Sequence, residues 1–252
     1  MELIILDDEK ISTFIEIFRN LKPMIDLMDI DFTEDGVYSQ SMDNNHVSLF
    51  EMKFTKDWFD EYSCDQSVTL GVNNVILFSV LNCYDKGHIL KIEVGENCDK
   101  MDVYFESEDV NILNKHFKIP LFDLNSEKLH VPDAEYSADV KLETARYVNL
   151  IDELIKFNDN VRISLNEAEV HFNAEGDIKM NVVMEDFIEY AIEEGESFDV
   201  LFSLKYLHWM CSFSKLSPEM DMHFSKELPM KMMYSMGDNF VRFFLAPKMD
   251  DY

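Results

Sequence analysis

Glycine, proline and cysteine are scarce in this sequence, which has 7, 6 and 4 of them among 252 residues. The few glycines are scattered, which excludes a glycine-rich loop that cradles a phosphate group. The four cysteines have no paired spacing, so we predict reduced thiols and neither a disulfide framework nor a zinc site. The longest apolar run, from Val75 to Leu81 with Ser79 inside it, is too short to span a bilayer.

Basic residues are also scarce: 22 Lys and Arg stand against 50 Asp and Glu, a net charge of −28. No basic leader of a signal peptide precedes the first apolar residues, and we expect a soluble intracellular protein with no membrane partner. An apolar fraction of 47% with 13% aromatic residues is enough for a folded core. The net charge argues against contact with nucleic acid unless the acids are unevenly distributed.

The stretch from residue 28 to 54 predicts three strands. Apolar and polar residues alternate on both sides of a turn at 33–36, which is a hairpin pattern, and they alternate again from 47 to 54. A polar loop at 41–46 is therefore held between two strands of a sheet.

Apolar residues recur at helical spacing in four segments, and we predict helices at 8–22, 73–82, 143–157 and 204–215. Further strands are predicted at 62–72, in a hairpin from 89 to 105, at 113–119, and within 220–245. The second half repeats the order of the first, displaced by roughly 130 residues. An α+β fold of two similar domains follows, each with antiparallel sheets backed by two helices on one face.

The predicted domains are residues 1–119 and 136–252, joined by a connector at 120–135. The connector contains two prolines and no steady period, which is typical of an extended segment. Its apolar residues, Leu129 and Val131 among them, are available to lie on a surface.

The predicted helices carry little net charge. They contain seven basic and six acidic residues, whereas the rest of the chain has 15 basic and 44 acidic ones. The two short helices contain no carboxylate at all. Local field governs contact with phosphates more than net charge does, so the pattern favours a surface that faces nucleic acid. Burial of these helices, or contact with a partner protein, explains the same pattern and stays open.

Five short motifs point to a known family. In chain order they are Gln40-Ser41-Met42-Asp43, His46-Val47-Ser48-Leu49, Gly71-Val72-Asn73, Leu204-Lys205-Tyr206-Leu207 and Leu245-Ala246-Pro247-Lys248. Together they resemble the proliferating cell nuclear antigen (PCNA) family of sliding clamps over almost the whole chain. The resemblance implies the DNA clamp fold and a homotrimeric ring that encircles duplex DNA without reading its sequence.

The resemblance also implies a role in DNA replication and repair. Members of the family act as DNA polymerase processivity factors and as docking platforms for proteins that carry a PIP box, a short hydrophobic plug. We therefore expect DNA polymerase and a clamp loader among the partners. The resemblance implies no enzymatic activity, no cofactor and no metal. It implies a location in the nucleus, or in a viral replication compartment if the chain is virally encoded.

Three sets of site residues follow from the resemblance. The DNA-facing set is Arg19, Lys141, Arg146, Lys156, Lys205 and Lys215. The subunit interface is formed by two strand edges from neighbouring subunits. One edge contains Leu113, Lys115, His116 and Lys118, and the other contains Ile178, Met180 and Val182. The partner-binding set is Met42, His46, Val47, Leu129, Val131, Pro229, Phe244, Ala246 and Pro247.

The chain departs from the family pattern at several of these surfaces. Positions that are basic in the family hold Ser12, Thr13, Ser79, Asn82, Asn149, Asp152 and Ser212. Attraction to DNA should therefore be weak and sensitive to salt. Phe244 stands where the family has Tyr, and Glu167 where it has a modified lysine, so control by a ubiquitin-type modification is not expected there.

Two alternatives to a sliding clamp remain. The first is a clamp-like protein of altered oligomeric state that binds partners without encircling DNA. The loss of basic residues at the DNA-facing positions supports it. The second is an acidic metal-dependent hydrolase. Asp29 and Asp31 point to one face of a strand and are the nearest thing to a metal pair, but with 50 carboxylates a solvated strand face is the favoured interpretation.

Overall fold

The computed structural model describes residues 1–95, 99–124, 128–129, 135–174 and 178–249. The chain divides into two compact units, each of which is described by itself. The first comprises Met1–Asn45, Phe50–Leu129 and Gly237–Phe240. The second comprises His46–Leu49, His130–Met236 and Val241–Tyr252.

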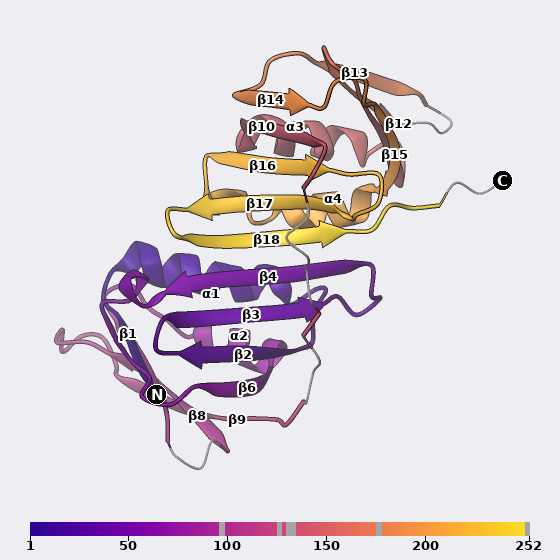
Figure 1. Ribbon diagram of the computed structural model, residues 1–252. Coiled ribbons are helices and arrows are strands. Elements are labelled where there is room, and N and C mark those ends of the chain that lie inside the picture. The colour runs from indigo at the N-terminus through magenta and orange to yellow at the C-terminus, as the bar shows by residue number, and fades with distance from the viewer. Residues whose placement is uncertain (96–98, 125–127, 130–134, 175–177, 250–252) are drawn as a thin grey trace. The chain divides into compact units, whose positions relative to one another are not determined.

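The first unit contains two helices and two groups of strands (Figure 1). The helices are α1 (Asp8–Leu21) and α2 (Asn74–Leu81). One sheet has the order β5-β1-β7-β8-β9, formed by Glu61–Ser63, Glu2–Ile5, Ile89–Val94, Lys100–Glu106 and Lys115–Pro120. The other group has the order β4-β3-β2-β6, formed by Ser48–Thr55, Gly36–Met42, Leu27–Thr33 and Val68–Asn73.

The second unit has the same plan. Its helices are α3 (Thr144–Leu154) and α4 (Leu204–Cys211). One group of strands has the order β14-β10-β16-β17-β18, formed by Glu189–Ile192, Ala138–Glu143, Glu219–Phe224, Met230–Met236 and Asn239–Leu245. The other sheet has the order β13-β12-β11-β15, formed by Met180–Met184, Val170–Ala174, Asn160–Leu165 and Phe198–Ser203.

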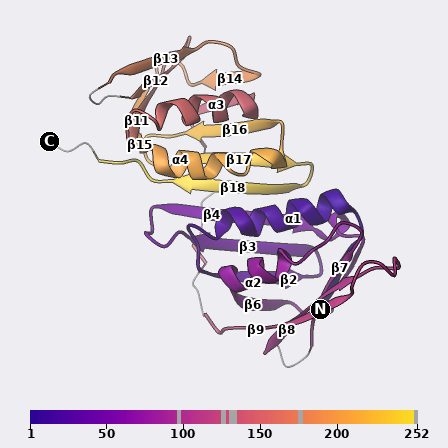
Figure 2. The ribbon, with the colours of Figure 1, turned by 180° about the vertical axis from the view of Figure 1, so that it is seen from behind.

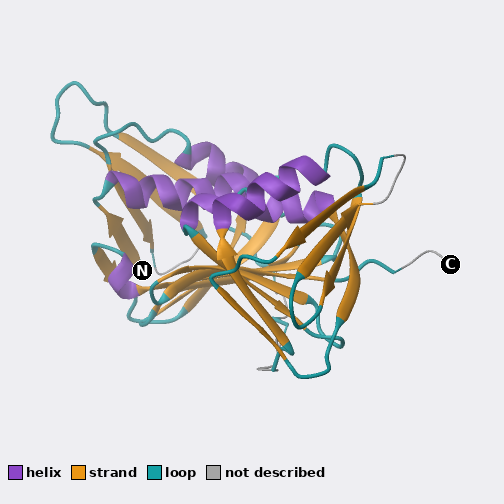
Figure 3. Cartoon of the chain, turned by 90° about the horizontal axis from the view of Figure 1, so that it is seen from above, coloured by secondary structure: helices purple, strands orange, loops and turns teal. Residues whose placement is uncertain are grey.

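Adding nine to each strand number of the first unit gives the strand order of the second, in both sheets. The predicted duplication is therefore confirmed at the level of topology. The helices hold equivalent places too, because each pair follows the first and the sixth strand of its unit. Figures 2 and 3 show that the helices of each unit lie on one side of that unit's strands. The predicted α+β architecture is likewise confirmed.

Helix α1 forms where the sequence provides both a cap and an apolar stripe. The Asp7 carboxylate accepts hydrogen bonds from the backbone N–H groups of Glu9 and Lys10, both at 2.9 Å. These bonds satisfy donors that the first turn leaves without partners. Phe14 and Phe18, one turn apart, are buried on the inner face.

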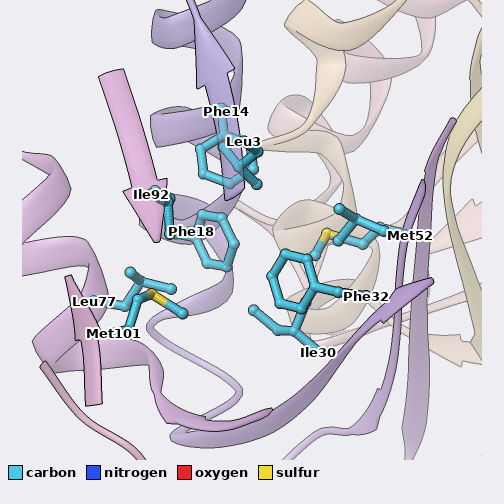
Figure 4. A pocket seen from close by; sticks show the side chains of 10 residues that line it. Leu3, Phe14, Phe18, Ile30, Phe32, Met52, Leu77, Ile92 and Met101 are labelled. Atoms are coloured by element: carbon cyan, nitrogen blue, oxygen red, sulfur yellow. The ribbon is translucent and has the colours of Figure 1, made fainter. Parts of the chain in front are cut away.

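The core of the first unit lies where both helices meet both sheets. A small apolar cavity of about 10 Å³ marks this place (Figure 4). Its lining residues are Leu3, Phe14, Phe18, Ile30, Phe32, Val37, Met52, Leu77, Ile92 and Met101. A void of this size is at the limit for one water molecule and offers no polar partner, so the core is dry and nearly filled.

The structure differs from the sequence predictions in one strand and in the ends of the helices. The strand predicted at 62–72 is wrong as one element, because the structure has β5 and β6 with a turn between them. The Cys64 thiol donates to the backbone carbonyl of Gln66 at 3.2 Å inside this turn, which the polar residues 65–67 favour. The four helices are confirmed with ends a few residues shorter than predicted. None of the helices described here has the length and apolar character needed to cross a membrane.

The packing of α2 gives a first test. Leu77 is 2% exposed and lines the core cavity, whereas Val75 on the same helix is 37% exposed. Leu77→Ala should lower the free energy of unfolding by about 2–5 kcal/mol, because a buried side chain leaves a cavity behind. Val75→Ala should change it by less than about 0.5 kcal/mol. Urea unfolding followed by fluorescence measures both. Equal losses would mean that α2 does not pack as described.

Candidate functional site

The outer face of the helices carries small polar residues at several positions. Ser12, Ser79, Asn82, Asn149 and Ser212 are all exposed, and Thr13 and Asp152 are half-buried. Each helix therefore has an exposed face, so burial does not explain the shortage of carboxylates. The sequence alternative of buried helices is wrong for the described structure.

A positive cluster closes the end of α1. The Arg19 guanidinium lies 5.7 Å and the Lys22 ammonium 5.5 Å from the centre of the Phe78 ring of α2. Cation–π contacts of this kind hold a charge in place while it stays in water. Arg19 also borders a groove between α1 and α2, together with Ser12, Glu16 and Asn82.

The other predicted DNA-facing residues differ in position. Lys205 is exposed in the first turn of α4, Lys156 follows the end of α3, and Lys215 lies in the short 3-10 helix Ser214–Leu216. Arg146 is on α3 and forms an ion pair with Asp186 at 3.0 Å. This leaves little net positive charge at Arg146.

Lys141 does not belong with these helical residues. Val140 and Leu142 point into the core of the second unit, where α3 packs against β10, so Lys141 between them faces the opposite side. Its ammonium lies 3.1 Å from the Glu219 carboxylate, which raises the pKa of Lys141. Strand alternation over residues 138–143 is the sequence signal that predicts this orientation.

Both predicted interface strands lie at sheet edges. β9 is the last strand of its sheet and pairs with β8 alone, and β13 is the last strand of its sheet and pairs with β12. On β9, the His116 ring stacks on Tyr104 and its Nε2 lies 2.5 Å from Asp102 Oδ1. That contact, with Lys118 at 3.2 Å, holds the pKa of Asp102 below its usual range.

Apolar side chains accompany these edges. Leu113 is exposed just before β9, and Ile178 is exposed just before β13. Met180 and Val182 are half-buried on β13 itself. Lys115 reaches back to the carbonyl of Cys83 at 2.6 Å and to Asp85 at 2.5 Å, so its charge is partly neutralised within the unit.

The second unit brings several of the predicted partner-binding residues together. The backbone N–H of Ala246 donates to the carbonyl of Val47 at 3.1 Å, which joins the loop after β3 to the segment after β18. Pro247 lines a hollow with Phe198, Phe202, Phe224, Leu228 and Met230. His46 and Pro229 are exposed, while Phe244 is buried beside the Arg242 guanidinium at 5.4 Å.

The first unit holds the remaining described members of the set. Met42 ends β3, and Leu129 of the connector is 50% exposed. Gln40 of β3 donates to the carbonyl of Leu129 at 2.9 Å and accepts from its N–H at 2.7 Å. Val131 lies outside the described residues.

The connector also covers Asp31, which corrects the interpretation of a solvated carboxylate pair. Asp29 and Asp31 are 7% and 6% exposed. Thr69 donates to Asp31 at 2.6 Å, and the ammonium of Lys128, from the connector, pairs with the same carboxylate. Alternation identified the face correctly, but only tertiary contacts show that this face is covered. Among the described residues, no group of three His, Cys, Asp or Glu is placed to hold a metal ion.

The start of the connector lies against β6 at Gly71. Phe122 donates its N–H to the carbonyl of Gly71 at 2.8 Å. A Cβ atom at residue 71 would lie 2.3 Å from the Phe122 carbonyl oxygen and 2.7 Å from Cγ of Leu124. Only glycine permits this approach, so close packing of the connector explains the glycine of the Gly71-Val72-Asn73 motif.

Two units of one topology, each with two sheets and a helix pair, define the two-domain clamp fold. The profile of the PCNA N-terminal domain matches residues 7–128, and that of the PCNA C-terminal domain matches residues 130–249. The proliferating cell nuclear antigen of Chaetomium thermophilum is 30% identical in an alignment 254 residues long, which covers 96% of this chain and 97% of that protein. The chain belongs to the PCNA family and is a sliding clamp.

Sequence reasoning missed the polar residues that hold the connector. Gln40 was read only as part of a motif, and Glu51, Lys128 and Tyr38 were not singled out. Glu51 within the apolar run from 47 to 54 was the available signal, because a carboxylate at a sheet position that becomes buried needs hydrogen-bond donors.

Gly71→Ala should displace the connector without unfolding the first unit. The added methyl group overlaps backbone atoms of Phe122, so the segment must move away from β6. We expect a protease that cleaves after Phe and Leu to cut residues 121–129 about tenfold faster, because cleavage follows the population of the displaced form.

Gly95→Ala is the matched control, since a Cβ there meets no atom within 4 Å. Mass spectrometry of the fragments locates each cut. An unchanged cutting rate in Gly71→Ala would contradict the close approach of the connector to β6.

Proposed function

We propose that the chain forms a homotrimeric ring that encircles duplex DNA, tethers DNA polymerase and docks PIP-box proteins. One observation carries the proposal: each unit presents an unpartnered edge strand, β9 in the first and β13 in the second. Such edges are ready to pair with another chain. Membership of the PCNA family supports the closed ring and a nuclear role in replication and repair.

The two edges are of different kinds. By the shift of nine strands, β9 is equivalent to β18, and β13 is equivalent to β4. Pairing of β9 with β13 of a second copy therefore joins unlike edges, which is a heterologous, head-to-tail contact. Such contacts close into a ring when the rotation fits and otherwise give open filaments. The family relationship favours closure with three copies.

The helices supply a surface that tolerates DNA without binding it tightly. Ser12, Ser79 and Asn149 are exposed on the helices. The positive charges of Arg19, Lys205 and Lys156 lie on the helices or directly after them. Asp152 accepts a contact from His208 at 3.0 Å, which shields one of the few acids there. With so few phosphate contacts, retention on DNA comes from encirclement, and direct affinity falls steeply with salt.

The docking function rests on the apolar residues near the connector and the chain segment after β18. Leu129 presents its side chain to solvent from a fixed backbone, and the joined segments at Val47 and Ala246 expose Pro247. The exposed carboxylate of Asp123 in the connector attracts the basic residues that flank a hydrophobic plug. No enzymatic activity is part of the proposal.

The shortage of basic residues on the predicted DNA-facing surface favours one second candidate, a clamp-like protein that docks partners but does not surround DNA. Polar or acidic side chains at seven positions that are basic in the family are the observation behind it. Oligomeric state separates the two candidates, because encirclement requires a closed assembly.

Light scattering should give three times the mass of one chain at micromolar concentration. Met180→Lys with Val182→Lys should convert the trimer to a monomer, because it replaces apolar contacts on β13 and opposes the basic residues of β9. Val200→Lys on β15, the other edge of the same sheet, is the control and should remain a trimer. A monomeric unmodified chain would refute the ring.

Leu129→Ala should weaken binding of a PIP-box peptide by at least about tenfold, because an exposed apolar anchor that becomes buried on binding carries much of the affinity. Leu6→Ala is a matched control: Leu6 is 51% and Leu129 50% exposed. Fluorescence polarisation measures peptide affinity, and light scattering checks that both variants keep their oligomeric state. Full affinity in Leu129→Ala would remove Leu129 from the docking site.

A further inference from the structure

Two residues of the connector are tied to the face of β2 and β3 that points away from the helices. The side-chain amide of Gln40 forms a two-point contact with the backbone of Leu129: Nε2 donates to the carbonyl at 2.9 Å, and Oε1 accepts from the N–H at 2.7 Å. The side chain thus imitates a neighbouring strand for one residue of the connector.

The carboxylate of Glu51 fixes which way this amide points. Glu51 lies on β4, is 2% exposed, and accepts from Gln40 Nε2 at 3.1 Å. An ionised carboxylate only accepts hydrogen bonds, so the amide must turn its NH₂ group towards Glu51. Its second N–H then meets the Leu129 carbonyl, and its oxygen meets the Leu129 N–H. The reversed amide would oppose like groups at all three contacts.

Two further contacts complete the arrangement. The Tyr38 hydroxyl donates to the same oxygen of Glu51 at 2.5 Å, so the buried carboxylate has two donors. The ammonium of Lys128 lies 5.8 Å from the Tyr38 ring centre and pairs with buried Asp31. Consecutive connector residues are therefore fixed by different means, Lys128 through its side chain and Leu129 through its backbone.

We propose that Gln40, oriented by Glu51, is a positioning residue for partner docking. It immobilises the backbone of Leu129 while the Leu129 side chain stays half exposed and ready to meet an apolar partner residue. Lys128 with Asp31 is the second attachment. The inference rests on the proposed docking function, and it adds that affinity for a hydrophobic plug depends on residues that the plug itself does not touch. A free connector would have to be ordered during binding, which lowers the apparent affinity.

The test uses four variants of the full chain. Gln40→Met keeps size and shape but removes all three hydrogen bonds. Gln40→Glu places a second carboxylate against Glu51 and loses the donors. Adding Glu51→Gln to Gln40→Glu restores one amide and one carboxylate in exchanged places. Gln66→Glu puts the same charge change on an exposed turn of the same unit and is the control.

Two readouts are measured on each variant. Hydrogen exchange at the Leu129 amide, resolved by fragmentation mass spectrometry, reports the contact itself and needs no partner. Fluorescence polarisation with a PIP-box peptide reports docking. Gln40→Met should abolish protection of the Leu129 amide and weaken the peptide roughly tenfold, since the docking-competent form becomes a minor population. Gln40→Glu should be weaker still. The exchanged pair should bind more tightly than Gln40→Glu because the two carboxylates no longer face each other, but it should not regain full affinity, because a carboxylate at position 40 cannot donate to the Leu129 carbonyl. Gln66→Glu should match the unmodified chain.

The outcomes separate the two claims. If the unmodified chain protects Leu129 but binds no peptide, the proposed docking function fails. If the peptide binds equally to the unmodified chain and to Gln40→Met, docking stands and the positioning role of Gln40 is overturned. The same follows if Leu129 is unprotected in the unmodified chain, or if the exchanged pair binds no better than Gln40→Glu.

Discussion

Backbone hydrogen bonding at the ends of the sheets is the constraint on which this structure depends. A strand satisfies its N–H and C=O groups only when it has a neighbour on each side. β9 and β13 each have one, β8 and β12. The outer sides of β9 and β13 have no strand neighbour in the part of the chain that the structure describes, and the proposed pairing with a second copy rests on these sides. In that proposed pairing, the exposed side chains of Leu113 and Ile178 beside these edges would favour one register.

The distribution of charge follows from the same layered plan. In each unit the helices cover one face of the strands. The inner side of each helix makes apolar core contacts, and its outer side forms an exposed surface. The acids are displaced to strands and loops, where water or a basic neighbour solvates them. α2 carries no charged residue at all, although Ile76 on it is 38% exposed. A net charge of −28 is thus compatible with a surface that does not repel a polyanion.

Periodicity was sufficient to predict the four helices, the hairpin of β2 and β3, and the duplication, because these depend on local spacing. It failed where tertiary contact decides. Alternation placed Asp31 on the outer face, but burial of Asp31 depends on Lys128, 97 positions later in the chain. Lys141 was assigned to the DNA-facing set from the resemblance, whereas the pleat of β10 turns its side chain away from the core, towards Glu219. The Gln40 contact with Leu129 has no sequence signal, since a side-chain amide can serve many partners.

The duplicated topology shows what the connector changes. In the first unit Thr69 of β6 donates to Asp31 of β2, and at the equivalent strands of the second unit Ser164 of β11 donates to Asp199 of β15, both at 2.6 Å. The same hydroxyl–carboxylate pair therefore recurs across equivalent strands with its partners exchanged. The carboxylate of Asp31 is 9% exposed under Lys128, whereas that of Asp199 is 62% exposed beside Arg162. The same hydroxyl–carboxylate pair is therefore a buried attachment for the connector in the first unit and an exposed surface contact in the second.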